Sequence, residues 1–588
     1  MSDTGSRRGR DDLRSPDEDG GNHRGPQQHE TYDLLRSLWL PAVALDGRLC
    51  QVGLVDAVLR AHELRWIDAE APVVTAALHR LLLAFAHRVY GPGDESEWAE
   101  LWEAPSLPAG PLEAYLDDFG DRFDLFGERP FFQTPGIPDT KIGSAAQLTM
   151  YRATGNNVTL FDHTVAEDRV ELHPADAARW LVTVQAYDTG GMKTPFDTDK
   201  SSERGLCNHF ATLLVEGATL KETLLLNMPV YAPGRERPHN TFPGDLPIWE
   251  RDEPTGPKPV KEGPPPAGWT ELLTWPSRRI RLRPVRRGTE IRVDGAAILP
   301  GTRLRVPLYD VENMAAFERD KRSKKGAKGR TGVTLGEPRP VVLEDLRGIW
   351  RHSRELLLPA PELGERIRPR TLDHIADMAR REHIPPEAVY TLRVFGQRLD
   401  PQAGAVRAWL QESLPTPIAL LRADRRLPQL EQLLGHAVEL ADGVGKELDR
   451  LERGYAATLG ERLSRRDAEK RRLLTQWYWP ELVAPFGMLL QDLGAVLHET
   501  PPEEPLTDTE ARVAGTVIGL FGGWSDRVRR IADQTRHRWV DRSPRKPGRD
   551  LIALADHDRA LKSATSRLYH EYGLAVRDYW PVGPEEDE

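Results

Sequence analysis

The sequence is poor in cysteine, with only Cys50 and Cys207 among its 588 residues. Two cysteines cannot build a disulfide scaffold or a multi-cysteine zinc or iron–sulfur site, and such sparse use is typical of a reducing compartment. No apolar run approaches the roughly 18–20 residues that a membrane span needs. The N-terminal stretch also lacks the apolar segment of a secretory signal. We therefore expect a cytoplasmic protein.

Common catalytic motifs are missing as well. GxSxG, HExxH, CxxC and a strand-following GxGxxG do not occur. The stretch 190–194 (GGMKT) resembles a phosphate loop only in part, because a methionine separates its glycines from the lysine. The sequence Asp556-His557-Asp558 is the one hint of a metal-dependent hydrolase, but it cannot fill a coordination shell alone, and a solvated helix face is the alternative. The sequence favours a binding protein over an enzyme and predicts no cofactor or metal.

Positive charge is concentrated in one segment of an acidic chain. The chain has 80 Lys and Arg against 90 Asp and Glu, a net charge of −10. Residues 278–330 nevertheless contain 16 Lys or Arg and six Asp or Glu, a local net charge of +10 that leaves −20 for the remainder. The overall charge argues against a uniformly basic nucleic-acid binder, whereas segregated charge can still form a local binding surface.

The chain divides into a mixed region and a helical region. Residues 1–30 are polar without apolar periodicity, which predicts a disordered tail. Residues 31–403 combine helical periodicity with short β-like runs, and residues 404–580 contain long amphipathic stretches that predict an antiparallel bundle. Residues 581–588 form an acidic tail. The predicted fold class is α+β, a large mixed α/β N-terminal domain followed by a C-terminal four-helix bundle.

Individual elements follow from periodicity and turn residues. Helices are expected over 71–90 and 174–188, with β-like runs at 279–282, 290–293 and 303–309. The bundle helices are expected over 430–451, over 473–493 with bends at Pro480 and Pro485, from Thr507 past Trp524, and over 550–572 with an end at Gly573.

Several strings in a fixed order resemble one protein family. Residues 34–43 (LLRSLWLPAV) are similar to its opening strand, and residues 122–133 (RFDLFGERPFFQ) to its most distinctive stretch. Residues 213–217, 224–227 and 275–280 follow in the expected order. The chain thereby resembles CasA, the large subunit of the type I-E CRISPR surveillance complex called Cascade. The resemblance covers residues 32–400, and the helical region matches in character and placement.

The resemblance implies a non-catalytic subunit that reads the protospacer-adjacent motif (PAM) of double-stranded DNA through the minor groove. Such a subunit helps open the duplex so that guide RNA can pair and form an R-loop, and its bundle recruits a helicase–nuclease. The implied partners are the other Cascade subunits, guide RNA, target DNA and the helicase–nuclease. A metal-dependent nucleic-acid hydrolase and a purely structural subunit of a ribonucleoprotein are the alternatives.

The resemblance also implies two devices that hold the PAM. A glycine loop at Gly190 and Gly191 would let the backbone approach base edges where a Cβ would collide, with a helix cap at Gly190 as the alternative. A cationic finger, a lysine in relatives, corresponds to the loop 283–288. Arginine suits a narrow minor groove, and the choice between Arg286 and Arg287 stays open. A solvated hairpin turn is the alternative for this loop.

A third implied device is a glutamine wedge that disrupts the base step beside the PAM. Unstacking one step costs a few kcal/mol, which the PAM contacts must offset. A hairpin tip is a suitable carrier, and residues 394–402 end in turn chemistry at Asp400-Pro401. Gln402 is the predicted wedge and Gln397 the second choice, with an ordinary polar turn as the alternative.

Guide contact is implied for Asn156, Asn157 and Phe161, because aromatic rings commonly stack on single-stranded RNA. The alternatives are a turn for the asparagines and a core position for the phenylalanine. The lysine-rich stretch 317–331 is expected to be a mobile loop that contacts DNA phosphates with little sequence preference. Its cations are Lys321, Arg322, Lys324, Lys325, Lys328 and Arg330.

Overall fold

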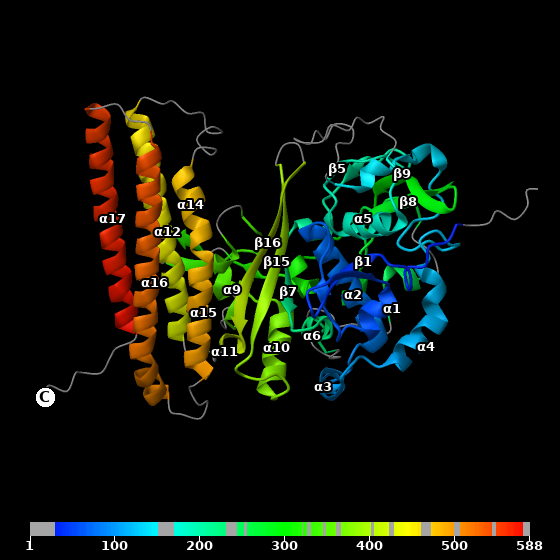
Figure 1. Cartoon of the computed structure of the whole chain (residues 1–588), viewed down its shortest axis with the longest axis horizontal. Coiled ribbons are helices and arrows are strands. Elements are labelled where there is room, and N and C mark those ends of the chain that lie inside the picture. Colours follow the sequence, from blue (N-terminus) through cyan, green and yellow to red (C-terminus); the bar gives the residue numbers. More distant parts are fainter. Residues whose placement is uncertain are drawn as a thin grey trace, which may run out of the picture.

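The structure is a computed structural model. It describes residues 30–150, 170–230, 244–251, 256–319, 321–325, 331–344, 348–359, 366–400, 405–422, 428–459, 472–498, 506–543 and 548–579. A mixed α/β body and a bundle of long helices lie side by side, with the tall hairpin β15–β16 standing between them (Figure 1). This is the α+β class that the sequence predicts.

Antiparallel pairing dominates the sheets, whose strand orders include β2-β1-β3, β4-β9-β8 and β16-β15-β7. The strands are β1 (Leu40–Ala44), β2 (Leu49–Val52), β3 (Leu64–Ile67), β4 (Gly143–Ser144), β5 (Gly191–Met192), β6 (Ser201–Ser202), β7 (Thr212–Glu216), β8 (Arg278–Arg287), β9 (Glu290–Pro300), β10 (Phe317–Glu318), β11 (Lys321–Lys325), β12 (Thr331–Leu335), β13 (Arg339–Pro340), β14 (Arg366–Ile367), β15 (Val389–Leu399) and β16 (Val406–Pro417).

Helix α2 forms the centre of the N-terminal domain. It is buried on nearly all sides from Val73 to His87 and packs against α5, α7 and β15. An all-round apolar helix of this kind is stable only inside a core. The helices of this domain are α1 (Leu54–Leu59), α2 (Pro72–Tyr90), α3 (Glu95–Glu103), α4 (Ala109–Phe119), α5 (Pro174–Tyr187), α6 (Leu220–Leu226), α7 (Trp269–Leu273), α8 (Leu308–Val311), α9 (Ser353–Leu357), α10 (Arg370–Arg380) and α11 (Ile418–Leu421).

The C-terminal bundle follows the predicted helical stretches. Its second helix is broken into α14 and α15 near Pro480 and Pro485, as expected, because a proline removes a backbone donor and crowds the preceding turn. The last helix continues past Gly573, since Val576 beyond it is still buried. The bundle helices are α12 (Pro428–Thr458), α14 (Leu473–Glu481), α15 (Val483–His498), α16 (Leu506–Arg542) and α17 (Arg549–Tyr579).

The two regions share one continuous apolar core. Trp350, in the short 3-10 helix Ile349–His352, is fully buried against the bundle, with its ring centroid 4.8 Å from that of Phe486 and 6.0 Å from that of Trp524. The Arg351 side chain also donates to Asp442 of α12, with Nε 2.7 Å from Oδ1. The bundle is therefore packed onto the N-terminal domain rather than tethered by a linker.

Three sequence expectations need correction. The boundary at 403/404 falls inside the β15–β16 hairpin, because β16 pairs with β15 along its whole length, and the first bundle helix begins only at Pro428. The run 303–309 is not a strand, since it leads into helix α8 at Leu308. The lysine-rich stretch is a hairpin rather than a loop over its described part, where β11 pairs with β12 from Lys321–Leu335 to Lys325–Thr331.

Candidate nucleic-acid interface

Helix α5 leads directly into the predicted glycine loop. The imidazole Nδ1 of His173 accepts a hydrogen bond from Ala175 N at 3.1 Å, and Pro174 occupies the first helical turn, which fixes the start of the helix. After Tyr187 the chain leaves as a small hairpin, residues 189–204, closed at its base by Gly205 N donating to Asp188 O at 2.7 Å. Gly191 and Met192 pair with Ser202 and Ser201 within it. We call residues 189–204 the glycine hairpin.

The two glycines have different roles. Gly191 has a φ of +108°, and a Cβ built on it would meet no atom within 4 Å, so its backbone is strained for other residues and open to solvent. A Cβ on Gly190 would lie 3.1 Å from Arg204 N and 3.2 Å from Ser202 O, so this glycine allows the two legs of the hairpin to approach. The helix-cap alternative for Gly190 does not hold, because α5 ends at Asp188 in an extended conformation.

A buried carboxylate lies under the glycine hairpin. Asp188 is 6% exposed and pairs with both Arg278, the first residue of β8, and Lys193 of the hairpin, whose Nζ lies 2.8 Å from its Oδ2. Burial acts to raise the pKa of Asp188, but Lys193 and Arg278 together hold it below its usual value. The carboxylate therefore stays ionised and links three segments of the chain.

The hairpin β15–β16 is hydrogen-bonded to the C-terminal end of α5, next to the base of the glycine hairpin. The Gln397 side chain donates from Nε2 to Tyr187 O at 2.9 Å and to Asn208 Oδ1 at 3.1 Å, and its Oε1 accepts from Trp409 Nε1 at 2.8 Å. Gln397, the second choice for the wedge, is thus occupied within the protein. Gln402 lies outside the described residues, between Leu399 and Val406 in the sequence, which form the last residue pair of the two strands.

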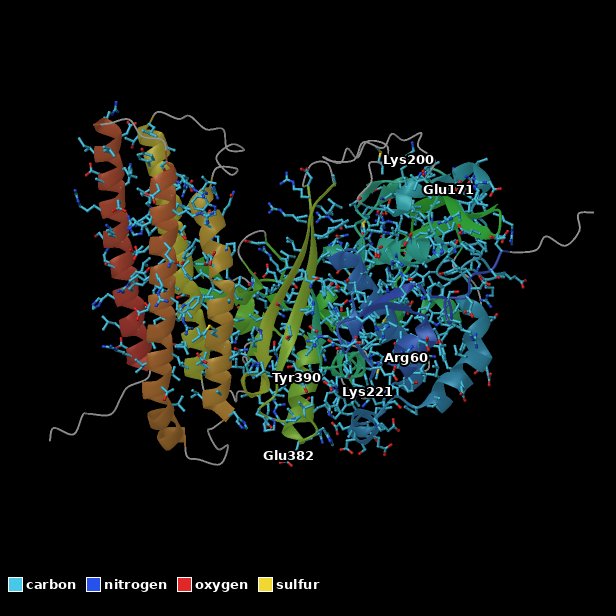
Figure 2. All side chains as sticks on the ribbon, viewed as in Figure 1. Arg60, Glu171, Lys200, Lys221, Glu382 and Tyr390 are labelled. Atoms are coloured by element: carbon cyan, nitrogen blue, oxygen red, sulfur yellow. The ribbon has the colours of Figure 1, made fainter. Side chains whose placement is uncertain are left out.

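The glycine hairpin and the tip of β15–β16 lie at the same edge of the molecule. In the view of Figure 1, β5 and the end of the β15–β16 hairpin both point to the upper edge, and Lys200 of the glycine hairpin marks this edge in Figure 2. The contact of Gln397 with Tyr187 O places strand β15 at the end of α5 from which the glycine hairpin leaves.

Arg286 and Arg287 are the last two residues of β8, paired with Ile291 and Glu290 of β9, at the opposite end of the strand from Arg278, which lies under the glycine hairpin. Arg286 Nε lies 3.0 Å from an oxygen of Glu30, and Arg287 Nε lies 2.9 Å from an oxygen of Glu171. Glu171 precedes α5, whereas the glycine hairpin follows it, and a helix of 14 residues is about 21 Å long. A motif of a few base pairs spans only about 10 Å, so this placement favours other cations beside Gly191, and the PAM contact of Arg286 and Arg287 stays a prediction.

The arginines that do lie beside the glycine hairpin are Arg303 and Arg305, which the sequence reasoning missed. Arg303 Nη2 donates to Ser201 O at 3.2 Å, and Arg305 Nη1 lies 3.1 Å from Glu203 Oε1. They follow the end of β9, which turns back beside the hairpin. The Arg-x-Arg pair after Gly301 was visible in the sequence, but its position depends on how far the β8–β9 hairpin extends.

The other predicted contacts fall largely outside the described side chains. The backbone of Lys321, Arg322, Lys324 and Lys325 forms β11, while Lys328 and Arg330 lie outside the described residues. Asn156, Asn157 and Phe161 also lie outside them.

The Asp556–Asp558 stretch does not form a metal site in the structure. Asp558 Oδ1 accepts from Arg536 at 2.7 Å, Asp556 pairs with Arg559 at 3.3 Å, and His557 Nε2 lies 3.1 Å from Thr458 Oγ1. Within the described ranges no group of three or more His, Cys, Asp or Glu could hold a metal ion. Among the residues that the structure describes, no helix is long and apolar enough to cross a membrane.

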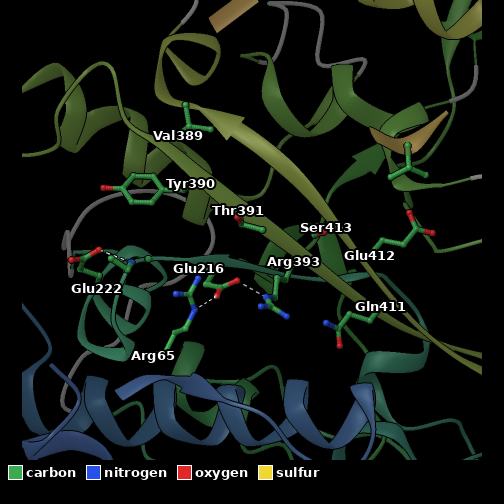
Figure 3. Close-up of a pocket in the computed structure, with 13 residues that line it drawn as sticks. Arg65, Glu216, Glu222, Val389, Tyr390, Thr391, Arg393, Gln411, Glu412 and Ser413 are labelled. Carbon is green, nitrogen blue, oxygen red and sulfur yellow. Dashed lines mark hydrogen bonds and ion pairs between the residues drawn. The ribbon is translucent and has the colours of Figure 1, made fainter. Parts of the chain in front are cut away.

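A further cavity of about 670 Å³ lies on the sheet β16-β15-β7, away from the glycine hairpin (Figure 3). Glu216 lies at its centre between Arg65, 4.0 Å away, and Arg393, which donates to it. The guanidinium of Arg393 also lies 3.4 Å from the ring centroid of Trp66. These charges compensate one another within the protein.

The whole architecture is shared with proteins of CRISPR immunity. The crystal structure of Cse1 from Acidimicrobium ferrooxidans superposes with a TM-score of 0.69 at 26% identity, covering 93% of this chain and 100% of that chain. Cse1 from Thermobifida fusca gives a TM-score of 0.68 at 25% identity, covering 94% and 98%. A chain of a CRISPR RNA-guided surveillance complex shares the fold, with a TM-score of 0.61 at 22% identity over 87% of this chain and 99% of that one.

Sequence comparison defines the family. The CRISPR-associated protein CasA/Cse1 of Thermus thermophilus is 33% identical over 447 residues, which are 74% of this chain and 80% of that protein. The sequence model of the family described as CRISPR-associated protein Cse1 matches residues 33–520. The chain belongs to this Cse1 (CasA) family, the family of the large Cascade subunit.

Proposed function

We propose that the chain is the non-catalytic large subunit of a type I-E Cascade complex that recognises the PAM and starts R-loop formation. The observation that carries this proposal is the glycine hairpin, in which the exposed backbone of Gly191 lies near two arginines and beside the hairpin that carries Gln402. Membership of the Cse1 family and the fold shared with a chain of a surveillance complex support it.

The proposed mechanism uses binding energy to deform DNA. The backbone of Gly191 approaches the base edges of the minor groove, which offers a degenerate pattern of donors and acceptors, so that several related PAM sequences are accepted. Gln402 then enters the adjacent base step at a cost of a few kcal/mol. Guide RNA captures the freed strand and makes the opening persist.

The cationic finger of this mechanism is assigned to Arg303 and Arg305 rather than to Arg286 and Arg287. A guanidinium in a narrow minor groove meets an enhanced negative potential. Arg303 is bonded to a carbonyl of the glycine hairpin, so its charge and the backbone of Gly191 can address the same base pairs. Arg286 and Arg287 pair with Glu30 and Glu171. Since Arg303 and Arg305 also pair with a carboxylate, that of Glu203, the assignment rests on their position beside the glycine hairpin and not on a free charge.

The remaining contacts of the proposal concern nucleic acid outside the PAM and the recruited partner. Asn156, Asn157 and Phe161 contact guide RNA, and the bundle helps recruit the helicase–nuclease. The lysine-rich hairpin contacts DNA phosphates, which adds affinity and salt dependence but little sequence preference. Its proposed phosphate ligands are Lys321, Arg322, Lys324, Lys325, Lys328 and Arg330.

The test uses the complete particle, assembled with its partner subunits and a guide RNA. Affinity is measured at one fixed salt concentration for duplexes that differ only in the PAM. The R303A/R305A variant should lose at least ten-fold in affinity for the PAM duplex, whereas R286A/R287A should retain it. The finger assignment fails if the effects are reversed. An unsubstituted particle that binds all duplexes equally would point to a purely structural subunit.

A further inference from the structure

We propose that Asp188 and Lys193 are positioning residues that hold the glycine hairpin in its reading conformation, so that Lys193 does not bind DNA phosphates. The inference rests on the proposed function. It concerns the role of Lys193. A lysine in a hairpin that contacts the PAM would otherwise be expected to bind a DNA phosphate.

The lysine is directed inward. Lys193 Nζ lies 2.9 Å from Asp188 Oδ1 and 2.8 Å from Oδ2, and its side chain is only 17% exposed. The neighbouring Met192 is 81% exposed, so the inward position is not a general property of this strand. Lys193 therefore spans the base of the hairpin that it belongs to.

Arg278 is the second cation paired with Asp188, and we call Asp188, Lys193 and Arg278 together the anchor. The Arg278 side chain is 2% exposed, and besides pairing with Asp188 it donates from Nη2 to Thr189 O at 3.3 Å and to Glu203 O at 2.6 Å. These carbonyls belong to the two opposite legs of the glycine hairpin. One carboxylate and two cations thus fix both legs and the lysine between them.

Apolar packing holds the hairpin at one place away from its base, where Phe196 packs against the small cluster of Ile137, Ala297 and Leu299. The two strands of the hairpin, β5 and β6, have two residues each, and isolated short hairpins are at best marginally stable. A cavity of about 210 Å³ lies between the hairpin and the end of β9, lined among others by Ser202, Trp275 and Thr302. With a cavity beside them, the two legs at the base of the hairpin are positioned mainly by the contacts of Asp188, Lys193 and Arg278.

Moving Lys193 to a phosphate would disturb this anchor. Asp188 is buried, and removal of one partner from a buried ion pair is strongly destabilising because the remaining charge is left with less compensation. The neighbouring Lys258 differs, since its side chain is 75% exposed and lies 4.0 Å from Asp197. It offers a matched control in which one positive charge near the hairpin is removed without loss of the anchor.

The test compares PAM discrimination with salt dependence in the complete particle. K193M should lower the ratio of PAM to non-PAM affinity at least ten-fold, while the slope of log K against log salt stays unchanged. D188N should lower the same ratio and make the slope steeper by about one, because the freed lysine gains access to a phosphate. K193R should restore part of the discrimination, and K258M should keep it.

Two results would overturn the inference. One is a K193M particle that loses affinity equally for all duplexes with a slope shallower by about one, which would make Lys193 a phosphate ligand. The other is unchanged discrimination in K193M. Hydrogen exchange of the chain without DNA gives an independent readout, since K193M should speed exchange at residues 189–204 and K258M should not. If K193M speeds exchange at residues 189–204 but the unsubstituted particle shows no PAM preference, the positioning role of Lys193 stands and the proposed function is rejected.

Discussion

Arg80 and Glu312 form a bidentate ion pair inside the N-terminal domain, although they lie far apart in the sequence. Arg80 Nη1 lies 3.2 Å from Glu312 Oε1, and Nη2 lies 3.0 Å from Oε2, with both side chains at most 2% exposed. Glu312 Oε1 also accepts from Met314 N at 2.9 Å. The pair therefore fastens the central helix α2 to the segment that follows α8.

Substitution of this buried carboxylate should strongly destabilise the protein. We expect E312Q to lower the free energy of unfolding by about 3–5 kcal/mol, because it leaves the Arg80 guanidinium buried without a counter-charge. D556N breaks an exposed pair with Arg559 and should cost less than about 1 kcal/mol. Denaturant titration of both variants checks this, and equal midpoints would contradict the expectation.

Gly191 has a left-handed conformation, so its substitution should reduce both stability and PAM preference. Substitution of a comparable glycine far from the site should reduce stability alone. G191A should destabilise the chain by about 1–3 kcal/mol through backbone strain and should also abolish PAM preference. Gly548, at the start of α17, has a φ of +89° and equally open surroundings. G548A should therefore cost the same stability and leave PAM preference intact. Melting curves and duplex binding of the two variants together provide the measurement.

The two glutamines of the β15–β16 hairpin should behave in opposite ways. Q402A should bind the PAM duplex but fail to open it, since the proposed wedge is gone. Q397A should retain the wedge but lose the hydrogen bonds to Tyr187 and Trp409, at about 1–3 kcal/mol of stability. Fluorescence of a base analogue placed next to the PAM reports opening. Normal opening by Q402A would remove the wedge assignment.

Buried histidine should make the N-terminal domain sensitive to acid. Burial lowers the pKa of His79 to about 4, and the nearby Arg393 acts in the same direction. An unfolded histidine titrates near 6.5, so stability is retained above pH 6.5 and decreases as the pH falls towards 4, by about 1.4 kcal/mol per pH unit. H79F keeps the ring contact with Trp66 and should make this dependence shallower, while the buried His87, whose pKa burial lowers to about 3, retains part of it. Denaturant midpoints between pH 7 and 5 test it, with the exposed His570 replaced as a control.

The C-terminal helical bundle could be predicted from the sequence because its signal is local. Apolar residues recur with the helical period from residue 430 onward, and the structure has its long helices there. The break near Pro480 and Pro485 follows from proline geometry alone. The end predicted at Gly573 was wrong, because one glycine costs a helix only about 1 kcal/mol and packing of Val576 continues the helix.

The candidate site could be predicted only where it depends on one segment. Turns at Gly190-Gly191 and near Gly288 could be predicted, because glycine and turn residues mark such places in the chain. The expected loop 283–288 is wrong in extent, since β8 continues to Arg287. Which arginine approaches Gly191 depends instead on the length of β8 and β9 and on the return path after Pro300. The roles of Asp188 and Gln397 likewise depend in part on partners more than 80 residues away in the sequence, Arg278 for Asp188 and Tyr187 for Gln397.

The long pairing of β15 with β16, which is regular up to a register shift between Arg398 and Leu399, has a consequence for how this family can vary. Side chains alternate between the two faces of a strand, so a single inserted residue would turn the contact of Gln397 with Tyr187 outward. Insertion of two residues in each strand above Gln397 would preserve that contact and move the turn outward by about 6–7 Å. The reach of the tip is therefore adjustable in increments of paired residues, which makes hairpin length a quantity to engineer when Cascade variants with altered target preference are sought.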